Sequence, residues 1–144
     1  MSDIKICPFV KAKEHMSDDE YFKALVAEVF QVVIGIEPVI ARWRYIERAF
    51  DGFSVDKVAK FNNADIERLM LDARIIRNRK KIRAVIQNAR EFLKIKSEYG
   101  SFESYIKSFE GDTKRLVADL DSRLHYVGAP SIRRFLSCVT QKAA

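Results

Sequence analysis

Apolar residues between positions 82 and 93 repeat with the period of an α-helix. They are Ile82, Val85, Ile86, Ala89, Phe92 and Leu93. Because they fall on one helical face, they predict a helix packed against a core. Other apolar stripes of this kind follow along the chain, and only five glycines and three prolines interrupt its 144 residues. A many-stranded protein needs more of these residues at its turns, so we predict an all-α fold.

Capping residues place the helix boundaries. Ser17 and Glu20 have the spacing of a capping box and start a helix that we expect to run to about Ile34. Further caps, glycines and prolines divide the rest of the chain into short segments. Together they predict a single-domain bundle of about eight short helices over residues 1–144. We expect an irregular N-terminal segment over residues 1–16 and a helix-hairpin-helix near the C-terminus.

Two cysteines and two histidines raise the question of a zinc site. Neither Cys7 with His15 nor His125 with Cys138 has the short chelating spacing of structural zinc sites. We therefore expect free thiols, surface histidines, no metal and no other cofactor.

The longest apolar stretch, residues 24–36, is too short to span a bilayer. We also find no signal peptide at the start of the chain. These features predict a cytoplasmic protein that does not act at a membrane.

The net charge of +6 favours a polyanionic partner. Cations gather around a turn at Asn78; they are Arg74, Arg77, Arg79, Lys80, Lys81 and Arg83. A second basic turn is the hairpin "YVGAPSIRR" at 126–134, where a glycine lets the backbone come close to a partner and a helix N-terminus suits a phosphate. Two such turns on one domain fit successive phosphates of a DNA duplex. The alternative is two solvated connections between helices.

Glu28 and Gln31 interrupt the apolar stretch 24–36. Because a buried carboxylate without a partner is costly, Glu28 needs a reason to be there. One possibility is a pocket in which Glu28 binds a ligand. The other is a partner within the protein such as an arginine, or a position at the edge of the core.

Four stretches of the chain together resemble the DNA-3-methyladenine glycosylase I family, which belongs to the helix-hairpin-helix superfamily. They are "EVFQVVIGI" at 28–36, "RAFDGFSVDKVAKF" at 48–61, "DIERLMLDARIIRNRKKIRAVIQNAREFL" at 65–93 and "YVGAPSIRRFL" at 126–136. The third is the most specific, since it looks like the family's own succession of helix, "IIRNR.KI" turn and "I.NA..FL" helix. In the same order as in the family, they extend over roughly residues 20–139.

The resemblance implies a base-excision enzyme that flips an alkylated purine, such as 3-methyladenine, out of double-stranded DNA and hydrolyses its bond to the sugar. It gives Glu28 the catalytic and base-binding role and assigns Gln31 and Ile36 to the base site. It further implies a monomer whose DNA contacts come from the two basic turns. These contacts are Arg77, Arg79, Lys80, Lys81, Tyr126, Gly128, Ser131 and Arg133.

The chain also departs from the family. Ile36 stands where the family's "LSW" pattern has an aromatic residue that stacks on the base. The family's opening aromatic segment has no counterpart in residues 1–16, and the zinc ligands of its closing segment are missing before the chain stops at Ala144. Two further hypotheses therefore stay open: a non-catalytic helix-hairpin-helix domain that binds DNA, and a helical module that binds an acidic protein.

Overall fold

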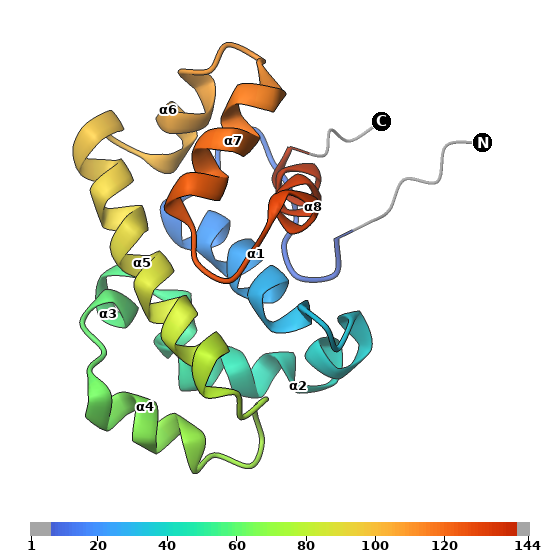
Figure 1. The fold of residues 1–144 in the computed structure, drawn as a ribbon, viewed down its shortest axis with the longest axis vertical. Helices are drawn as coiled ribbons and strands as arrows, with labels where there is room; N and C mark the ends of the chain where they lie inside the picture. Colours follow the sequence, from blue (N-terminus) through green and yellow to red (C-terminus); the bar gives the residue numbers. More distant parts are fainter. Residues whose placement is uncertain (1–6, 141–144) are drawn as a thin grey trace.

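Eight α-helices and one short 3-10 helix form the fold of residues 7–140, which are the residues that the computed structural model describes (Figure 1). In chain order they are α1 (Asp18–Gln31), α2 (Ile36–Ala49), η1 (Asp51–Phe53), α3 (Val55–Ala59), α4 (Asn63–Met70), α5 (Arg79–Tyr99), α6 (Phe102–Lys107), α7 (Thr113–Arg123) and α8 (Ala129–Val139). No strand occurs in this range. The predicted all-α, single-domain bundle is confirmed.

Helix α1 lies at the centre of the bundle. It runs between α5 and α8 and packs against both (Figure 1). Every residue from Tyr21 to Phe30 except Lys23 is buried. A helix that is covered on nearly all sides must be apolar nearly all round, which explains the long apolar stretch in the sequence. Glu28 is the one charged side chain in this buried part of α1.

The two ends of α1 are fixed by different interactions. The predicted capping box of Ser17 and Glu20 is present at its start. At its end the helix stops at Gln31, three residues before the predicted end, because Val33 has a positive φ of 73° that no α-helix continues through. The ammonium group of buried Lys81 donates hydrogen bonds to the carbonyls of Phe30 at 2.8 Å and Val32 at 2.6 Å. These bonds satisfy helix-terminal acceptors and tie the loop after α1 to α5.

The predicted helix-hairpin-helix is formed by α7, the segment 124–128 and α8. The hairpin places its two helices in contact with each other, and α8 also packs along α1. Pro130 lies in the first turn of α8, where its missing N–H costs no helical hydrogen bond. Because α8 packs against both α7 and α1, it connects the hairpin to the central helix.

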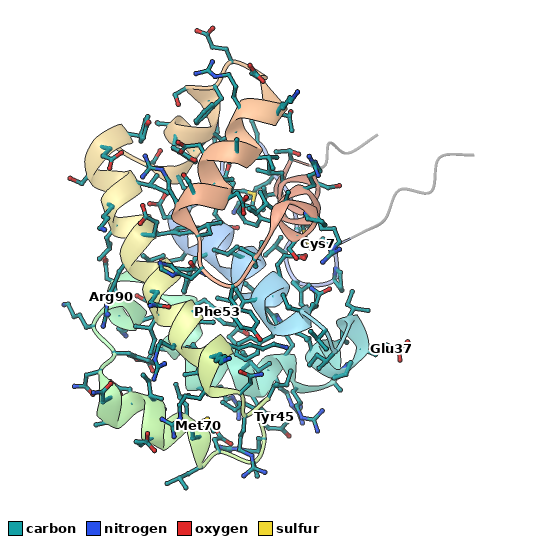
Figure 2. The ribbon with its side chains drawn as sticks, viewed as in Figure 1. Cys7, Glu37, Tyr45, Phe53, Met70 and Arg90 are labelled. Carbon is teal, nitrogen blue, oxygen red and sulfur yellow. A yellow bond between two sulfur atoms is a disulfide. The ribbon has the colours of Figure 1, made fainter. Side chains whose placement is uncertain are left out.

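The prediction of free thiols is wrong. Cys7 and Cys138 form a disulfide, with 5.4 Å between their Cα atoms. The label in Figure 2 places Cys7 beside α8, which carries Cys138. Residues 7–17 run to the start of α1 without helix or strand. The fold brings this segment against α8, and such proximity between residues 131 positions apart cannot be read from sequence spacing.

No helix within residues 7–140 combines the length and the hydropathy that a membrane span needs.

Candidate functional site

Glu28 presents its two carboxylate oxygens to different surroundings. Only 6% of the residue is exposed. Its Oε1 accepts a hydrogen bond of 3.1 Å from Nε of Arg134 in α8. Its Oε2 accepts none from residues 7–140, and no buried side-chain oxygen or nitrogen in that range lacks a partner, so Oε2 still reaches solvent. One oxygen is therefore bound by the protein, and the other keeps contact with solvent.

The buried environment of Glu28 disfavours the ionised form of its carboxyl group. Burial raises the pKa of the Glu28 carboxyl above its ordinary value, and the nearby Arg134 guanidinium opposes this rise without cancelling it. A carboxylate kept in such a place gains from any further donor or positive charge that reaches it. Glu28 thus has an electrostatic reason to bind a cation or a hydrogen-bond donor.

Arg134 is the arginine partner that one interpretation of the sequence allowed for. Its side chain is 57% exposed, and its Nη2 also donates to Oγ of Ser131 at 3.2 Å. The pair joins α1 to α8 across 106 positions of sequence. Glu28 lines none of three cavities formed by the described residues, of which the largest, about 770 Å³, lies between α6, α7 and α8. The hollow expected beside Glu28 is not among these three.

The other two predicted base-site residues lie near the end of α1. Gln31 follows Glu28 by one turn, and its amide Nε2 donates to the carbonyl of Ala27 at 3.0 Å. Ile36 opens α2 and is 40% exposed. Their contact with a base stays a prediction.

The loop between α1 and α2 carries apolar side chains into solvent. Val33 is 96% exposed, and Ile34 is 40% exposed. Large aliphatic side chains such as these are usually buried. Val33 is also strained, because a β-branched residue rarely adopts a positive φ. This exposed apolar tip follows directly on the helix that carries Glu28. It could not be found from the sequence, because the run 24–36 has the pattern of one continuous core helix.

Some cations of the basic turn before α5 are exposed, and others are bound by neighbouring protein groups. Arg77 and Lys80 are exposed and form no ion pair with residues 7–140. Arg79 pairs with Glu67, which leaves its guanidinium partly engaged. The prediction for Lys81 is wrong, since Lys81 is 1% exposed and bound to carbonyls of the α1 end. It positions the loop after α1 instead of reaching a phosphate.

The hairpin before α8 leaves its backbone open. Tyr126 is 38% exposed and has a positive φ of 70°. Gly128 is exposed with a φ of −106°, and a Cβ added there would meet only Cδ of Pro130, at 3.9 Å. Neither its conformation nor its packing requires a glycine, so the missing side chain leaves room for a partner outside the fold.

The start of α8 adds donors to this surface. Its first backbone hydrogen bond runs from the N–H of Ile132 to the carbonyl of Gly128, at 3.0 Å. The N–H groups of Ala129 and Ser131 precede it at the positive end of the helix. The hydroxyl of Ser131 is buried and bound by Arg134, so its predicted DNA contact is limited to this backbone group. Arg133 is exposed.

Asn88 fixes the hairpin to α5 and was not singled out in the sequence. It is fully buried, its Nδ2 donates to the carbonyl of His125 at 3.1 Å, and its Oδ1 accepts from the N–H of His125 at 2.7 Å. A single side chain thus satisfies both backbone groups of one hairpin residue. The only signal was an asparagine on the apolar face of the stripe 82–93.

The donor atoms present do not fit a zinc ion. Within residues 7–140 no group of three or more histidines, cysteines or acidic residues is placed to hold a metal. Cys7 and Cys138 are bonded to each other, and Nδ1 of His15 lies 3.0 Å from Oε1 of Glu103. The two thiols and this imidazole nitrogen are thus engaged with other protein groups and are not gathered around one metal position.

We predict that Glu28→Gln changes the pH dependence of stability. Because folding raises the pKa of Glu28, its stabilising contribution is fully present below the ordinary pKa and is lost as the pH rises through the raised one. The free energy of unfolding of the variant, measured in urea, should therefore rise relative to that of the wild type as the pH increases from the ordinary carboxyl pKa through the raised one. Glu37→Gln, at an exposed glutamate that points away from the protein, is the matched control (Figure 2). A constant or shrinking difference would contradict the burial of the charge.

We predict that Asn88→Ala loosens the hairpin. It leaves the N–H and the carbonyl of His125 without their partner, at a cost of about 1–3 kcal/mol in the free energy of unfolding. Amide hydrogen exchange at residues 124–128 should speed up more than exchange in α1. Asn63→Ala, at an exposed asparagine of α4, should leave both quantities unchanged. Equal exchange in the two variants would show that Asn88 does not hold the hairpin.

Comparison with known proteins identifies the family. The family model of methyladenine glycosylases matches residues 12–128. DNA-3-methyladenine glycosylase 1 of Escherichia coli (strain K12) is 34% identical over 88 residues, which are 61% of this chain and 47% of that protein. The DNA-3-methyladenine glycosylase of Haemophilus influenzae is 27% identical over 97 residues, 67% of this chain and 52% of that one.

A solved structure agrees with this assignment. The 3-methyladenine DNA glycosylase I of Staphylococcus aureus superposes with a TM-score of 0.80 at 26% identity, covering 90% of this chain and 79% of that one. The chain spans about half the length of the curated relatives that it matches. On the extent of the family match and the shared fold, the chain belongs to the methyladenine glycosylase family.

Proposed function

We propose that this protein is a DNA glycosylase that removes an alkylated purine of the 3-methyladenine kind from double-stranded DNA. The observation that carries the proposal is the buried carboxylate of Glu28 with its open Oε2. The relatives support the substrate class, since each is a 3-methyladenine glycosylase by name. The proposal includes a cytoplasmic protein that acts as a monomer.

Charge explains why a carboxylate suffices for recognition. A purine methylated at N3 while bonded to the sugar carries a positive charge, and it is already a good leaving group. Glu28 can select it by charge and by accepting the hydrogens of its amino group. The bond from C1′ of the sugar to the base then breaks, with its electron pair leaving on the base, which becomes neutral. The oxygen of a water bonds to C1′ and the water gives up a proton.

The base must leave the duplex before Glu28 can reach it, and the exposed tip after α1 suits this step. Proteins that kink or open DNA often insert apolar side chains between base steps. Val33 and Ile34 offer such side chains in solvent, on the loop that follows the helix of Glu28. We assign them to the gap that the flipped base leaves. Lys81 and its two carbonyl bonds keep this loop at the end of α1.

Phosphate binding falls to the hairpin and the basic turn. The open backbone at Gly128 and the free N–H groups at the start of α8 suit one phosphate. Exposed Arg77, Lys80 and Arg133 add positive charge without being held in ion pairs by residues 7–140. Such contacts would position the protein on the strand without reading its sequence.

Glu28→Gln should separate binding from catalysis. Loss of the negative charge should lower the single-turnover rate of purine release from alkylated DNA by about 100-fold or more, because the charge acts on the reacting base. Affinity for undamaged duplex DNA should stay the same, since phosphate contacts supply it. Excision at the wild-type rate in this variant would remove Glu28 from the mechanism. Wild-type protein that binds DNA and releases no base would favour the non-catalytic alternative.

Gly128→Ala should weaken DNA binding without harming the fold. A Cβ at this position meets only Cδ of Pro130 at an ordinary contact distance, so the midpoint of urea unfolding should not move. The added methyl group blocks the close approach of a phosphate and should raise the Kd for duplex DNA about tenfold at fixed salt. Unchanged affinity would show that the hairpin does not contact the strand. A wild-type affinity that does not fall with salt would favour an acidic protein as partner.

A further inference from the structure

Arg134 already supplies the positive charge that a cationic base would bring to Glu28. Its Nε lies 3.1 Å from Oε1, and no other ion pair to Glu28 forms within residues 7–140. Two cations that compete for one carboxylate repel each other, and the repulsion grows when water is excluded. The arginine therefore affects which base the site accepts.

Of the two partners, only Arg134 is free to move. Glu28 is fixed in the middle of the central helix and is 6% exposed. Arg134 has a side chain that is 57% exposed, and its second contact is one hydroxyl, that of Ser131, at 3.2 Å on its own helix. A guanidinium that leaves Glu28 can go directly into water, where it costs little.

We propose that Arg134 is the specificity-determining residue of the Glu28 site: its guanidinium on Oε1 repels a positively charged base that binds at Oε2, whereas a neutral base binds beside the intact ion pair without this penalty. This inference rests on the proposed function, because it takes Glu28 to face the base. It also goes further, since it assigns to this chain a weaker preference for charged bases than Glu28 alone would give. Damaged purines that carry no charge therefore compete better with cationic purines for this site than they would if Glu28 had no arginine partner.

Free bases test the inference without any bond cleavage. The probes are 3,9-dimethyladeninium, which carries a fixed positive charge, and 9-methyladenine, which is neutral. Each is titrated into the full chain and followed by NMR, and the quantity compared is the Kd of the neutral probe divided by that of the cation. In Arg134→Gln this ratio should rise about 3- to 10-fold, as expected for the loss of one partly exposed competing charge. In Arg134→Lys, which keeps the charge, it should stay within about twofold of the wild type.

Two further variants serve as controls. Arg115→Gln removes an exposed arginine of α7 that forms no ion pair with residues 7–140, so it should leave the ratio unchanged. In a Glu28→Gln background, Arg134→Gln should also leave the ratio unchanged, because the contested carboxylate is gone. A ratio that does not rise in Arg134→Gln, or that rises equally in Arg115→Gln, would overturn the inference.

Binding and excision report on different claims. Failure of both probes to bind any variant also overturns the role of Arg134. Binding with the expected ratios, together with no purine release from alkylated DNA, would support Arg134 as the charge determinant and overturn the proposed catalysis.

Discussion

The ion pair between Glu28 and Arg134 is the interaction on which the site depends. A lone carboxylate in the centre of a helical bundle would cost several kcal/mol, which a domain of this size with a small net stability can hardly carry. One hydrogen-bonded guanidinium from α8 reduces that cost and leaves Oε2 open. The same contact joins the central helix to the hairpin side of the molecule, so the proposed base site and the proposed strand contact lie on connected elements.

Two buried polar residues of α5 hold the surrounding backbone in place. Lys81 binds carbonyls at the end of α1, and Asn88 binds both backbone groups of His125. The two are seven positions apart, two turns along one helix, so α5 fixes the apolar tip and the hairpin relative to each other. Neither residue is exposed, yet both determine where exposed residues lie. A substitution that destabilises α5 should therefore disturb the proposed DNA contacts, even at a position that lies away from the DNA.

Local signals in the sequence were sufficient for most of the fold. The capping box at Ser17 and the stripe from Ile82 to Leu93 depend on neighbouring residues, and both are present in the structure. The helix-hairpin-helix followed from a glycine and a proline at a short spacing. Glu28 could be singled out because burial of a charged side chain within an apolar helix costs folding free energy.

Tertiary neighbours could not be predicted in the same way. Arg134 lies 106 positions from Glu28 and looks like the exposed Arg133 beside it. Lys81 sits in a run of cations, and only the packing of α5 against α1 separates it from exposed Lys80. The disulfide joins residues 131 positions apart. The early end of α1 depends on a positive φ at Val33, which β-branched residues rarely adopt.

The decisive measurement is a crystal structure of the protein with a duplex that carries an abasic-site analogue, soaked with 3-methyladenine. We expect the base within hydrogen-bond distance of Oε2 of Glu28, with the α1–α2 tip in the gap of the duplex. A base bound elsewhere, or a duplex that lies away from α1 and the hairpin, would contradict the role of Glu28.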